Sequence, residues 1–426
     1  MVIKIDKKKW IHYLLIYFLI IVNQSCLYEY FLNSDLIRFS IFLFFSFLLL
    51  IKFKKLYYPY IIFIGVLLIS VIFTRLIHGG IGITAWIGYA IPILVCLYTI
   101  SYDKDNFLDR FIKITTLLAF IGIILFLLQI LFPELLKKIL FFKYTTKMEY
   151  KIWQDSYTYS TQYYKGYGLL IYSFRDGGDA LMRNKGIFTE SGVCQMLYNS
   201  ALFVLLFLSN EINIKKSDIK KYILILILAI ITVQSTTGYI VMSVLLISFL
   251  LSKNNERIYY KLPIFMFIII GILFLGFDYI SRGDKSFLSI AIFDKFFNRS
   301  NEFEIHGNGM IRTNTALLSL KIMFSNFFGI GADKFLNLQK LEHLTGGGAG
   351  FFTFGATIGL IPFLLSLIMY INPLINTEMK KNVKITLIFM IFWSLSAQSN
   401  PFYTLLLIFP VYYSIQNYYK KNRRKI

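Results

Sequence analysis

The chain has 426 residues, of which 57% are hydrophobic, 18% aromatic and only 16% charged, and its formal net charge is +21. A soluble domain is on average about half apolar and about one quarter charged, so the composition argues against one. Apolar runs of about 18 residues or more recur along the sequence, and each is long enough to cross a hydrocarbon core about 30 Å thick. The sequence therefore predicts an all-α polytopic membrane protein, with residues 1–426 forming one integral membrane domain.

The first apolar run follows a basic start, "MVIKIDKKKW", as it does in a secretory signal. That run is long, and no small-residue cleavage site follows it, so we expect an uncleaved first span. The cysteines Cys26, Cys96 and Cys194 fall in or beside predicted spans. Their spacing indicates neither a metal site nor a disulfide framework.

About twelve transmembrane helices are predicted from the apolar runs and their flanking residues. We place them near 11–29, 36–51, 57–74, 81–100, 111–132, 192–209, 221–234, 238–252, 262–277, 349–371, 384–399 and 401–417.

Positive charge gathers in alternate connections between these spans. The basic set lies at 7–9, 52–55, 215–221, 380–381 and in the tail "KKNRRKI". The positive-inside rule assigns this set, with both termini, to the cytoplasm. The excess charge is then an insertion signal and a contact with anionic membrane lipids, and it indicates no nucleic-acid partner.

Two of the connections on the other face are long, at about 133–191 and 278–348. Long connections that are not linkers usually carry function. Both are rich in aromatic residues and contain apolar segments, so we expect large extracytoplasmic loops with amphipathic helices that fold against the mouth of the bundle.

The first long loop is rich in tyrosine, as in "DSYTYSTQYYKGYGLLIYSF". Tyrosine suits a membrane interface, and its ring also stacks on sugars; Tyr167 is our candidate for sugar binding. Arg183, Lys185 and Glu190 lie just before the sixth predicted span. There a charge is costly without water or a partner, and the two explanations are an ion pair that caps the helix or a site for an anionic headgroup.

The second long loop contains "HGNGMIRTNTALLSLKIMFSNFFGIG" at 306–331. Leu317, Leu320, Phe324 and Phe327 have the spacing of one helix face. The pattern predicts an amphipathic helix in the outer interface, which ends at the "GIG" of 329–331.

Arg312 is expected in the first turn of that helix, where a cation opposes the helix dipole. The position makes sense if the guanidinium and free backbone amides share a bound anion. Asn308 and Asn314, on the same segment, are expected to bind substrate. His343 precedes the tenth span beside a glycine run, and a structural role and a catalytic role for it are equally supported.

Other motifs carry no function in this sequence. "DKD" at 103–105 resembles a metal-binding motif but lies in a short cytoplasmic turn, and "NRS" at 298–300 is a common chance match to a glycosylation acceptor. There is no phosphate-binding glycine loop and no His/Cys cluster. We therefore predict no metal and no cofactor, with chemistry carried by Arg, His and Glu.

The chain resembles the Wzy-type O-antigen and capsule polymerases and their relative, the O-antigen ligase. The resemblance rests on "RNKGIFTESG" before a span, "QSTTGYIVMSVLLISFLL", and "GNGMIRTNTALLSLKIMFSNFFGIGADKF" followed by His343 and "FGATIGLIPFLL". The layout of about twelve spans and two large outer loops agrees with the family. Leu344 follows His343 where the family often has asparagine.

The resemblance implies a membrane glycosyltransferase of the bacterial cytoplasmic membrane, acting on its outer face. Undecaprenyl-diphosphate-linked oligosaccharide would be both donor and acceptor, and the diphosphate lipid would be released without a metal. Arg183 and Arg312 match the outer-loop arginines of the family, and His343 its histidine. Either His343 or Glu190 would act as base, and a chain-length regulator protein is a further expected partner.

Three alternatives stay open. An O-antigen ligase would transfer finished polymer to lipid A–core with the same donor. A transporter or flippase for lipid-linked sugars would have internal repeats, broken helices and polar groups near the bilayer centre, whereas the predicted spans here contain almost no ionisable residues. A purely structural membrane protein would leave the outer arginines unexplained.

Overall fold

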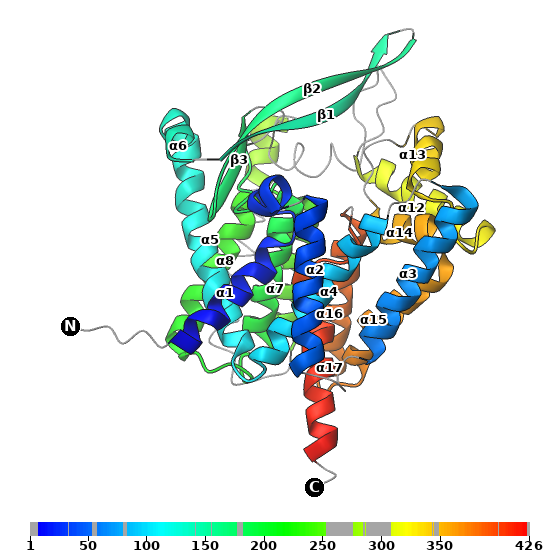
Figure 1. Ribbon diagram of the computed structural model, residues 1–426. Coiled ribbons are helices and arrows are strands. Elements are labelled where there is room, and N and C mark those ends of the chain that lie inside the picture. Colours follow the sequence, from blue (N-terminus) through cyan, green and yellow to red (C-terminus); the bar gives the residue numbers. More distant parts are fainter. Residues whose placement is uncertain are drawn as a thin grey trace.

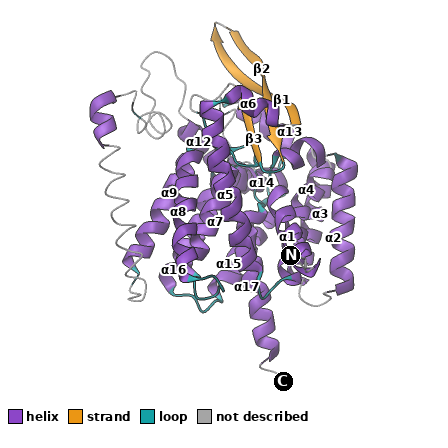
Figure 2. Ribbon diagram, turned by 90° about the vertical axis from the view of Figure 1, so that its left-hand side faces the viewer, coloured by secondary structure: helices purple, strands orange, loops and turns teal. Residues whose placement is uncertain are grey.

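The computed structural model describes residues 7–32, 34–52, 58–79, 83–140, 142–154, 156–176, 182–252, 276–283, 286, 308–342, 344, 349–398 and 400–423. Most of these residues are helical, and the helices lie side by side in one bundle (Figures 1 and 2). The strands β1, β2 and β3 and the helices α6, α12 and α13 lie at one end of the bundle, and the C-terminus extends from the other end (Figure 1).

The helices are α1 (Lys7–Ile21), α2 (Asp35–Lys52), α3 (Tyr58–His78), α4 (Ile83–Tyr102), α5 (Phe107–Leu131), α6 (Pro133–Ile139), α7 (Ser191–Phe207), α8 (Lys216–Val233), α9 (Thr236–Leu251), α12 (Asn308–Ser325), α13 (Ala332–Leu341), α14 (Gly350–Ile358), α15 (Leu360–Ile375), α16 (Lys381–Ser396) and α17 (Thr404–Arg423). A single π-type turn covers Tyr28–Leu32, and the strands are β1 (Phe142–Gln154), β2 (Ser156–Leu169) and β3 (Tyr172–Asp176).

The core of the bundle is built around α7 and α17. Every residue from Val193 to Leu206 of α7 is buried, as is every residue from Leu405 to Tyr413 of α17. A helix that is apolar on all sides is stable only where other helices surround it. α7 packs against α5, α8 and α9, and α17 packs against α4 and α15, so these two helices hold the two sides of the bundle together.

Several helices have the length and composition of membrane spans. Among the described residues, Tyr58–His78, Thr84–Tyr102 and Phe107–Leu131 are long and apolar enough to cross a bilayer. Shorter apolar helices accompany them at Trp10–Ile21, Ser191–Phe207, Thr236–Leu251 and Leu360–Ile375.

The outside of the bundle carries exposed apolar side chains, in addition to those buried in its core. Phe47 and Leu50 of α2 are 62% and 64% exposed, and Leu76 of α3 is 77% exposed. Soluble monomers rarely expose apolar patches of more than a few hundred Å². The distribution of apolar side chains therefore suits a helix bundle surrounded by hydrocarbon.

The helices follow the predicted spans, with three differences. α1 ends at Ile21, well before the predicted limit at 29. The tenth predicted span is divided at Gly359 into α14 and α15. The ninth predicted span, near 262–277, lies outside the described residues except for its last two positions.

The prediction of an all-α fold is wrong for the first long loop, which contains a three-stranded antiparallel sheet in the order β1-β2-β3. β1 pairs with β2 from Phe142↔Gly168 to Gln154↔Ser156. Tyrosine and threonine dominate these strands, and both favour extended backbone. A search for long apolar runs does not detect such a segment, because its aromatic residues are mixed with polar ones. Among its described residues this loop has one short helix, α6, whereas the described residues of the second long loop include α12 and α13 as expected.

The break between α14 and α15 results from hydrogen bonds to the loop after α12. The carbonyls of Ala356 and Thr357 accept from the backbone N–H groups of Ile330 (3.0 Å) and Gly331 (3.1 Å). In a continuous helix they would accept from residues four positions later. The N–H of Leu360 donates instead to the carbonyl of Phe327 (2.9 Å), so the loop replaces the helical bonds it interrupts.

Gly359 allows this exchange because its φ is +118° and a Cβ there would lie 2.7 Å from the carbonyl oxygen of Phe327. Only glycine adopts such a conformation readily. The close approach docks the second long loop against the bundle and so fixes the position of α12.

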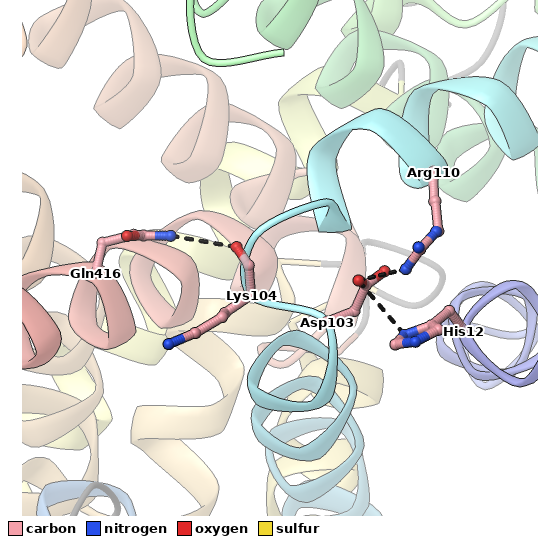
Figure 3. A network of polar contacts seen from close by, with 5 residues as sticks. All are labelled: His12, Asp103, Lys104, Arg110 and Gln416. Atoms are coloured by element: carbon pink, nitrogen blue, oxygen red, sulfur yellow. Dashed lines mark hydrogen bonds and ion pairs between the residues drawn. The ribbon is translucent and has the colours of Figure 1, made fainter. Parts of the chain in front are cut away.

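A buried ion pair organises the opposite end of the bundle, in the turn between α4 and α5 (Figure 3). The carboxylate of Asp103 forms an ion pair with Arg110 of α5 and lies 3.4 Å from Nδ1 of His12 in α1. Burial raises the pKa of Asp103, and Arg110 and His12 oppose that rise. The carbonyl of Lys104 accepts from Nε2 of Gln416 in α17 (3.3 Å), so one turn connects four helices.

We predict that Gly359→Ala lowers the free energy of unfolding, by about 1–3 kcal/mol from backbone strain alone. Gly65→Ala in α3 is the matched control, because a Cβ there has nothing within 4 Å and alanine favours a helix. Thermal unfolding of the purified proteins in detergent measures the difference. Equal midpoints for Gly359→Ala and the wild type would contradict this account of the helix break.

We also predict that Arg110→Ala destabilises the protein by about 3–5 kcal/mol, because it leaves the buried Asp103 carboxylate without its compensating charge. Protonation of Asp103 removes the negative charge of its carboxylate. The loss of stability in Arg110→Ala is therefore fully present at neutral pH and shrinks as the pH falls through the raised pKa of Asp103. Unfolding measured across a pH series tests this. Lys113→Ala, at an exposed position of the same helix, should show no such pH dependence; a constant deficit in Arg110→Ala would refute the explanation.

Candidate functional site

The segment 182–190 lies between β3 and α7 at the end of the bundle that carries the sheet, and its backbone is held from three sides. The N–H of Ser173 in β3 donates to the carbonyl of Gly186 (2.6 Å). The N–H of Cys26 donates to the carbonyl of Ile187 (2.9 Å), and the N–H of Asn184 donates to the carbonyl of Thr232 in α8 (3.0 Å). A non-helical segment in an apolar bundle requires such partners. They fix the side chains that the segment carries.

Asn184 organises the tight turn in this segment, and the sequence analysis did not single it out. Its side chain is fully buried. Nδ2 donates to Oγ1 of Thr232 (2.9 Å), and Oδ1 accepts from the N–H of Gly186 (2.9 Å). An asparagine two residues before a glycine is the signal of a side-chain-stabilised turn, so "NKG" could have indicated this role.

Gly186 completes the turn at a φ of +54°. A Cβ at Gly186 would lie 3.0 Å from Sγ of Cys194 and 3.1 Å from the hydroxyl of Tyr198. The turn therefore lies directly on α7. Its close contact sets how far Arg183 and Lys185 stand from that helix.

Glu190 is the acidic centre of the site and lies at the N-cap of α7. The residue is exposed to solvent, but protein surrounds most of its carboxylate. This desolvation raises the pKa of Glu190, and the positive charges of Arg312, Lys185 and Arg175, in decreasing order, oppose the rise. Three cations from three separate segments thus act on one carboxylate.

Arg312 brings the second long loop to this centre. It is the fifth residue of α12, one position beyond the first turn in which we expected it, and it is half-buried. Burial lowers the pKa of Arg312, and the charge of Glu190 opposes this change. Its Nε is buried and has no hydrogen-bond partner among the described residues.

The exposed side of α12 is only partly apolar. Leu317 is 60% exposed and Phe324 is 73% exposed, and Lys321 is exposed beside them. The buried side carries Thr315, Ser319, Ile322 and Met323. α12 ends at Ser325, so Phe327 and the "GIG" of 329–331 lie beyond the helix, which is shorter than the spacing predicted. A helix with large apolar and cationic residues on its exposed side suits a membrane interface.

Lys185 and Arg175 complete the cation cluster. Lys185 is buried although it is a lysine, with 6% of its surface exposed. Arg175 is half-buried in β3, and the sequence analysis missed it because nothing in "YSFRDGG" shows that a strand would place it beside Glu190. Its pairing with Gly166 of β2 is decided by the sheet register.

Arg183 occupies a neighbouring position rather than the centre of this cluster. Its charge acts on the hydroxyl of Tyr239, in the first turn of α9. Its Nε is buried and has no hydrogen-bond partner among the described residues. Arg183 therefore lies on the side of the segment that faces the turn between α8 and α9.

Two buried amides support that turn from α7. Nδ2 of Asn199 donates to Oε1 of Gln195 (2.9 Å) and to the carbonyl of Gly238 in α9 (3.2 Å). The carbonyl can only accept, so it fixes the amide orientation of Asn199 and, through it, that of Gln195. A Cβ at Gly238 would lie 2.8 Å from Cβ of Gln195, so α9 begins in direct contact with α7.

The remaining predicted residues are distributed as follows. Asn308 begins α12, and Asn314 is half-buried on the same helix. Tyr167 is half-buried and its ring stacks on that of Phe174 with centroids 5.2 Å apart, so it packs at the base of the sheet. His343 lies outside the described residues. Substrate roles for Asn308, Asn314 and Tyr167 stay predictions.

The part of the chain that the structure describes holds no group of three or more His, Cys, Asp or Glu residues that could bind a metal ion. Asp103 of the "DKD" motif takes part in the ion pair with Arg110 instead. What the cluster offers chemically is a set of guanidinium and ammonium groups suited to a phosphate or diphosphate, beside one carboxylate able to accept a proton.

Comparisons of this chain with known protein families, with curated proteins and with solved structures find no match.

Proposed function

We propose that this chain is a polysaccharide polymerase of the cytoplasmic membrane, with about twelve spans and both termini in the cytoplasm. It would join oligosaccharide repeat units carried on undecaprenyl diphosphate at the outer face. The observation that carries the proposal is the convergence of Arg312, Lys185 and Arg175 on Glu190. Such a cluster, at the mouth of an apolar bundle, suits a ligand that is both anionic and attached to a lipid.

The proposed reaction is one glycosyl transfer. A hydroxyl oxygen of the acceptor saccharide attacks the anomeric carbon of the donor and forms the new C–O bond. The bond between that carbon and the diphosphate oxygen breaks, and its electron pair leaves with the diphosphate. The proton of the attacking hydroxyl passes to a base, for which we propose Glu190. Atoms and charge balance without a further reactant.

The cations would stabilise the departing diphosphate. Negative charge accumulates on this group in the transition state, and fixed positive groups in a desolvated site stabilise it most effectively. Arg312 and Arg183 each have a buried Nε–H group that donates to no acceptor among the described residues, so each could donate to the diphosphate. The raised pKa of Glu190 also brings its proton affinity closer to that which a general base needs near neutral pH.

The glycan profile of cells that lack the protein tests the activity itself. We expect the polysaccharide ladder to disappear while core carrying a single repeat unit remains. A ladder that persists on the lipid carrier above bare lipid A–core would assign the chain to ligation instead. An unchanged profile of both surface polysaccharide and capsule would refute a role in polymer assembly.

We predict that Arg312→Ala abolishes the ladder, because loss of one transition-state contact typically lowers the rate by about 10²–10³. Arg183→Ala should act in the same direction, and Arg312→Lys should retain part of the activity. Lys321→Ala removes a positive charge from an exposed position of the same helix and is the control. The measurement is the gel profile together with protein abundance in the membrane. Full ladders from both arginine-to-alanine variants would refute the role of these arginines in transfer.

We predict an acid limb in the pH dependence of transfer, measured with membrane vesicles and lipid-linked substrate. Glu190 accepts a proton only when ionised, and its raised pKa moves the loss of activity to a higher pH than for an unperturbed carboxyl. Arg312→Lys should move the limb little. In the residual transfer activity of Arg312→Ala the limb should lie at a higher pH, because Arg312 is the main charge opposing the rise in the pKa of Glu190. The same limb in Glu190→Gln would exclude Glu190 as the base.

A further inference from the structure

A second carboxylate, that of Glu29, lies at the same end of the bundle as Glu190. Glu29 belongs to the π-type turn Tyr28–Leu32, which follows α1 at the end of the bundle that carries the sheet (Figure 1). The N–H of Glu29 donates to the carbonyl of Ser25 (2.8 Å), and the N–H of Tyr28 donates to the hydroxyl of Ser25 (3.1 Å). Ser25 therefore fixes the backbone that carries this carboxylate, and the residue is exposed to solvent beyond the end of α1.

The same stretch of chain is joined to the backbone of the candidate site. Ser25 forms an antiparallel β-bridge with Phe188. The N–H and the hydroxyl of Thr189 both donate to the carbonyl of Gln24, at 3.0 Å and 3.2 Å. Gln24 has a φ of +53°, which residues with a Cβ rarely adopt, so the surrounding contacts impose this conformation. Backbone hydrogen bonds thus hold the two carboxylate-bearing segments side by side.

The two carboxylates have different charged surroundings. Among the described residues, three cations act on Glu190 and one, Arg38 of α2, acts on Glu29. Burial raises the pKa of Glu29, the charge of Arg38 opposes the rise, and the charge of Glu190 adds to it. Arg38 also forms a hydrogen bond with the hydroxyl of Tyr28, so it is attached to the same turn. Neighbouring carboxyl groups in such unequal surroundings are typical of sites for acid–base chemistry.

The repulsion between the two carboxylates has a consequence for the base. Like charges held close together disfavour the ionised forms, so the stability of the fold gives no reason for this proximity. The interaction acts on both members of the pair. When both groups are ionised, the charge of Glu29 raises the proton affinity of Glu190, whereas the three cations lower it. A carboxylate among three cations alone would be a weak base, and a weak base removes a hydroxyl proton inefficiently.

We propose that Glu29 is a positioning residue of the transfer site, whose negative charge keeps Glu190 basic enough to accept the proton of the acceptor hydroxyl. The inference rests on the proposed function and adds the group that tunes its base. Glu29 acts through Glu190 and not on the reacting atoms. Arg38 has the complementary part, because a nearby cation favours the ionised form of a carboxyl group and so keeps the charge on Glu29.

The ionisation of Glu29 tests the pairing without any assay of transfer. The probe is dicyclohexylcarbodiimide, which reacts with protonated carboxyl groups, added over a pH series to the purified full-length protein in lipid nanodiscs. Mass spectrometry follows the labelling of Glu29. We expect Glu190→Gln to lower the midpoint pH of labelling by about half a unit or more, because it removes a like charge. Arg38→Ala should raise the midpoint, because it removes an opposite charge.

Two control variants remove comparable charges from other elements. Asp333→Asn removes an exposed carboxylate from the first turn of α13, and Arg75→Ala removes an exposed cation from the last turn of α3. Both should leave the labelling midpoint of Glu29 unchanged. A midpoint that Glu190→Gln does not lower, or that Asp333→Asn lowers equally, would overturn the pairing.

Transfer measured with membrane vesicles and lipid-linked substrate tests the role of Glu29 in the reaction. We expect Glu29→Gln to lower kcat about threefold to tenfold at neutral pH, because Glu190 becomes the weaker base, and to leave KM unchanged. Glu29→Asp keeps the charge and should retain most of the activity, and Asp333→Asn should retain all of it. An unchanged kcat in Glu29→Gln, or an equal loss in Glu29→Asp, would overturn the tuning role.

The two measurements separate this inference from the proposed function. An unchanged glycan profile in cells that lack the protein would refute the polymerase, and with it the role of Glu29 in transfer, while the labelling result would stand. Loss of the polysaccharide ladder together with a labelling midpoint that Glu190→Gln leaves in place would refute the inference alone.

Discussion

The attraction between Arg312 and Glu190 is the interaction on which the arrangement of the site depends. The two residues come from different long loops, 122 positions apart in the sequence, and each charge acts on the other at the mouth of the bundle. Both groups are desolvated, which disfavours the charged form of each. A charge in such a place is stabilised by an opposite charge. Lys185 and Arg175 of the first long loop act on Glu190 as well, and Arg312 of the second adds the largest contribution of the three.

Backbone hydrogen bonding places the two loops before any charge acts. The segment 182–190 is fixed by bonds to β3, to residues beside α1 and to the end of α8. The loop 327–331 is fixed by bonds to the carbonyls exposed where α14 ends. In both cases the irregular backbone is accommodated at the bundle because protein groups satisfy it. Helix interruption and loop docking are thus one structural event, and the glycines at the contacts, Gly186 and Gly359, allow the necessary closeness.

The same end of the molecule presents two surfaces of different chemistry. α12 carries the exposed side chains of Leu317 and Phe324 beside Lys321, and the cation cluster acts on Glu190. The lipid diphosphate of the proposed donor has an apolar and an anionic part, and the two surfaces suit these parts.

The opposite end has a different chemistry. There the charged groups, Asp103 and Arg110, are paired and largely buried, and the turn that holds them joins four helices (Figure 3). The Asp103–Arg110 pair joins helices of the bundle, whereas the cations around Glu190 come from the two long loops at its mouth. This difference in place assigns "DKD" to the fold and "RNKG" to the candidate site, although both look equally polar in the sequence.

The sequence by itself determined the helical bundle, the positions of most helices and the two long loops, because apolar runs and their charged flanks report burial directly. It also identified Arg183, Lys185, Glu190 and Arg312, since a charge beside a span needs an explanation. Tertiary structure decided which of these residues meet: Arg312 and Lys185 act on Glu190, while Arg183 acts on Tyr239. It also decided the sheet and the role of Arg175, because strand register depends on pairing between segments. The amides of Asn184, Gln195 and Asn199 likewise acquire roles only through partners distant in the sequence, which no local pattern specifies.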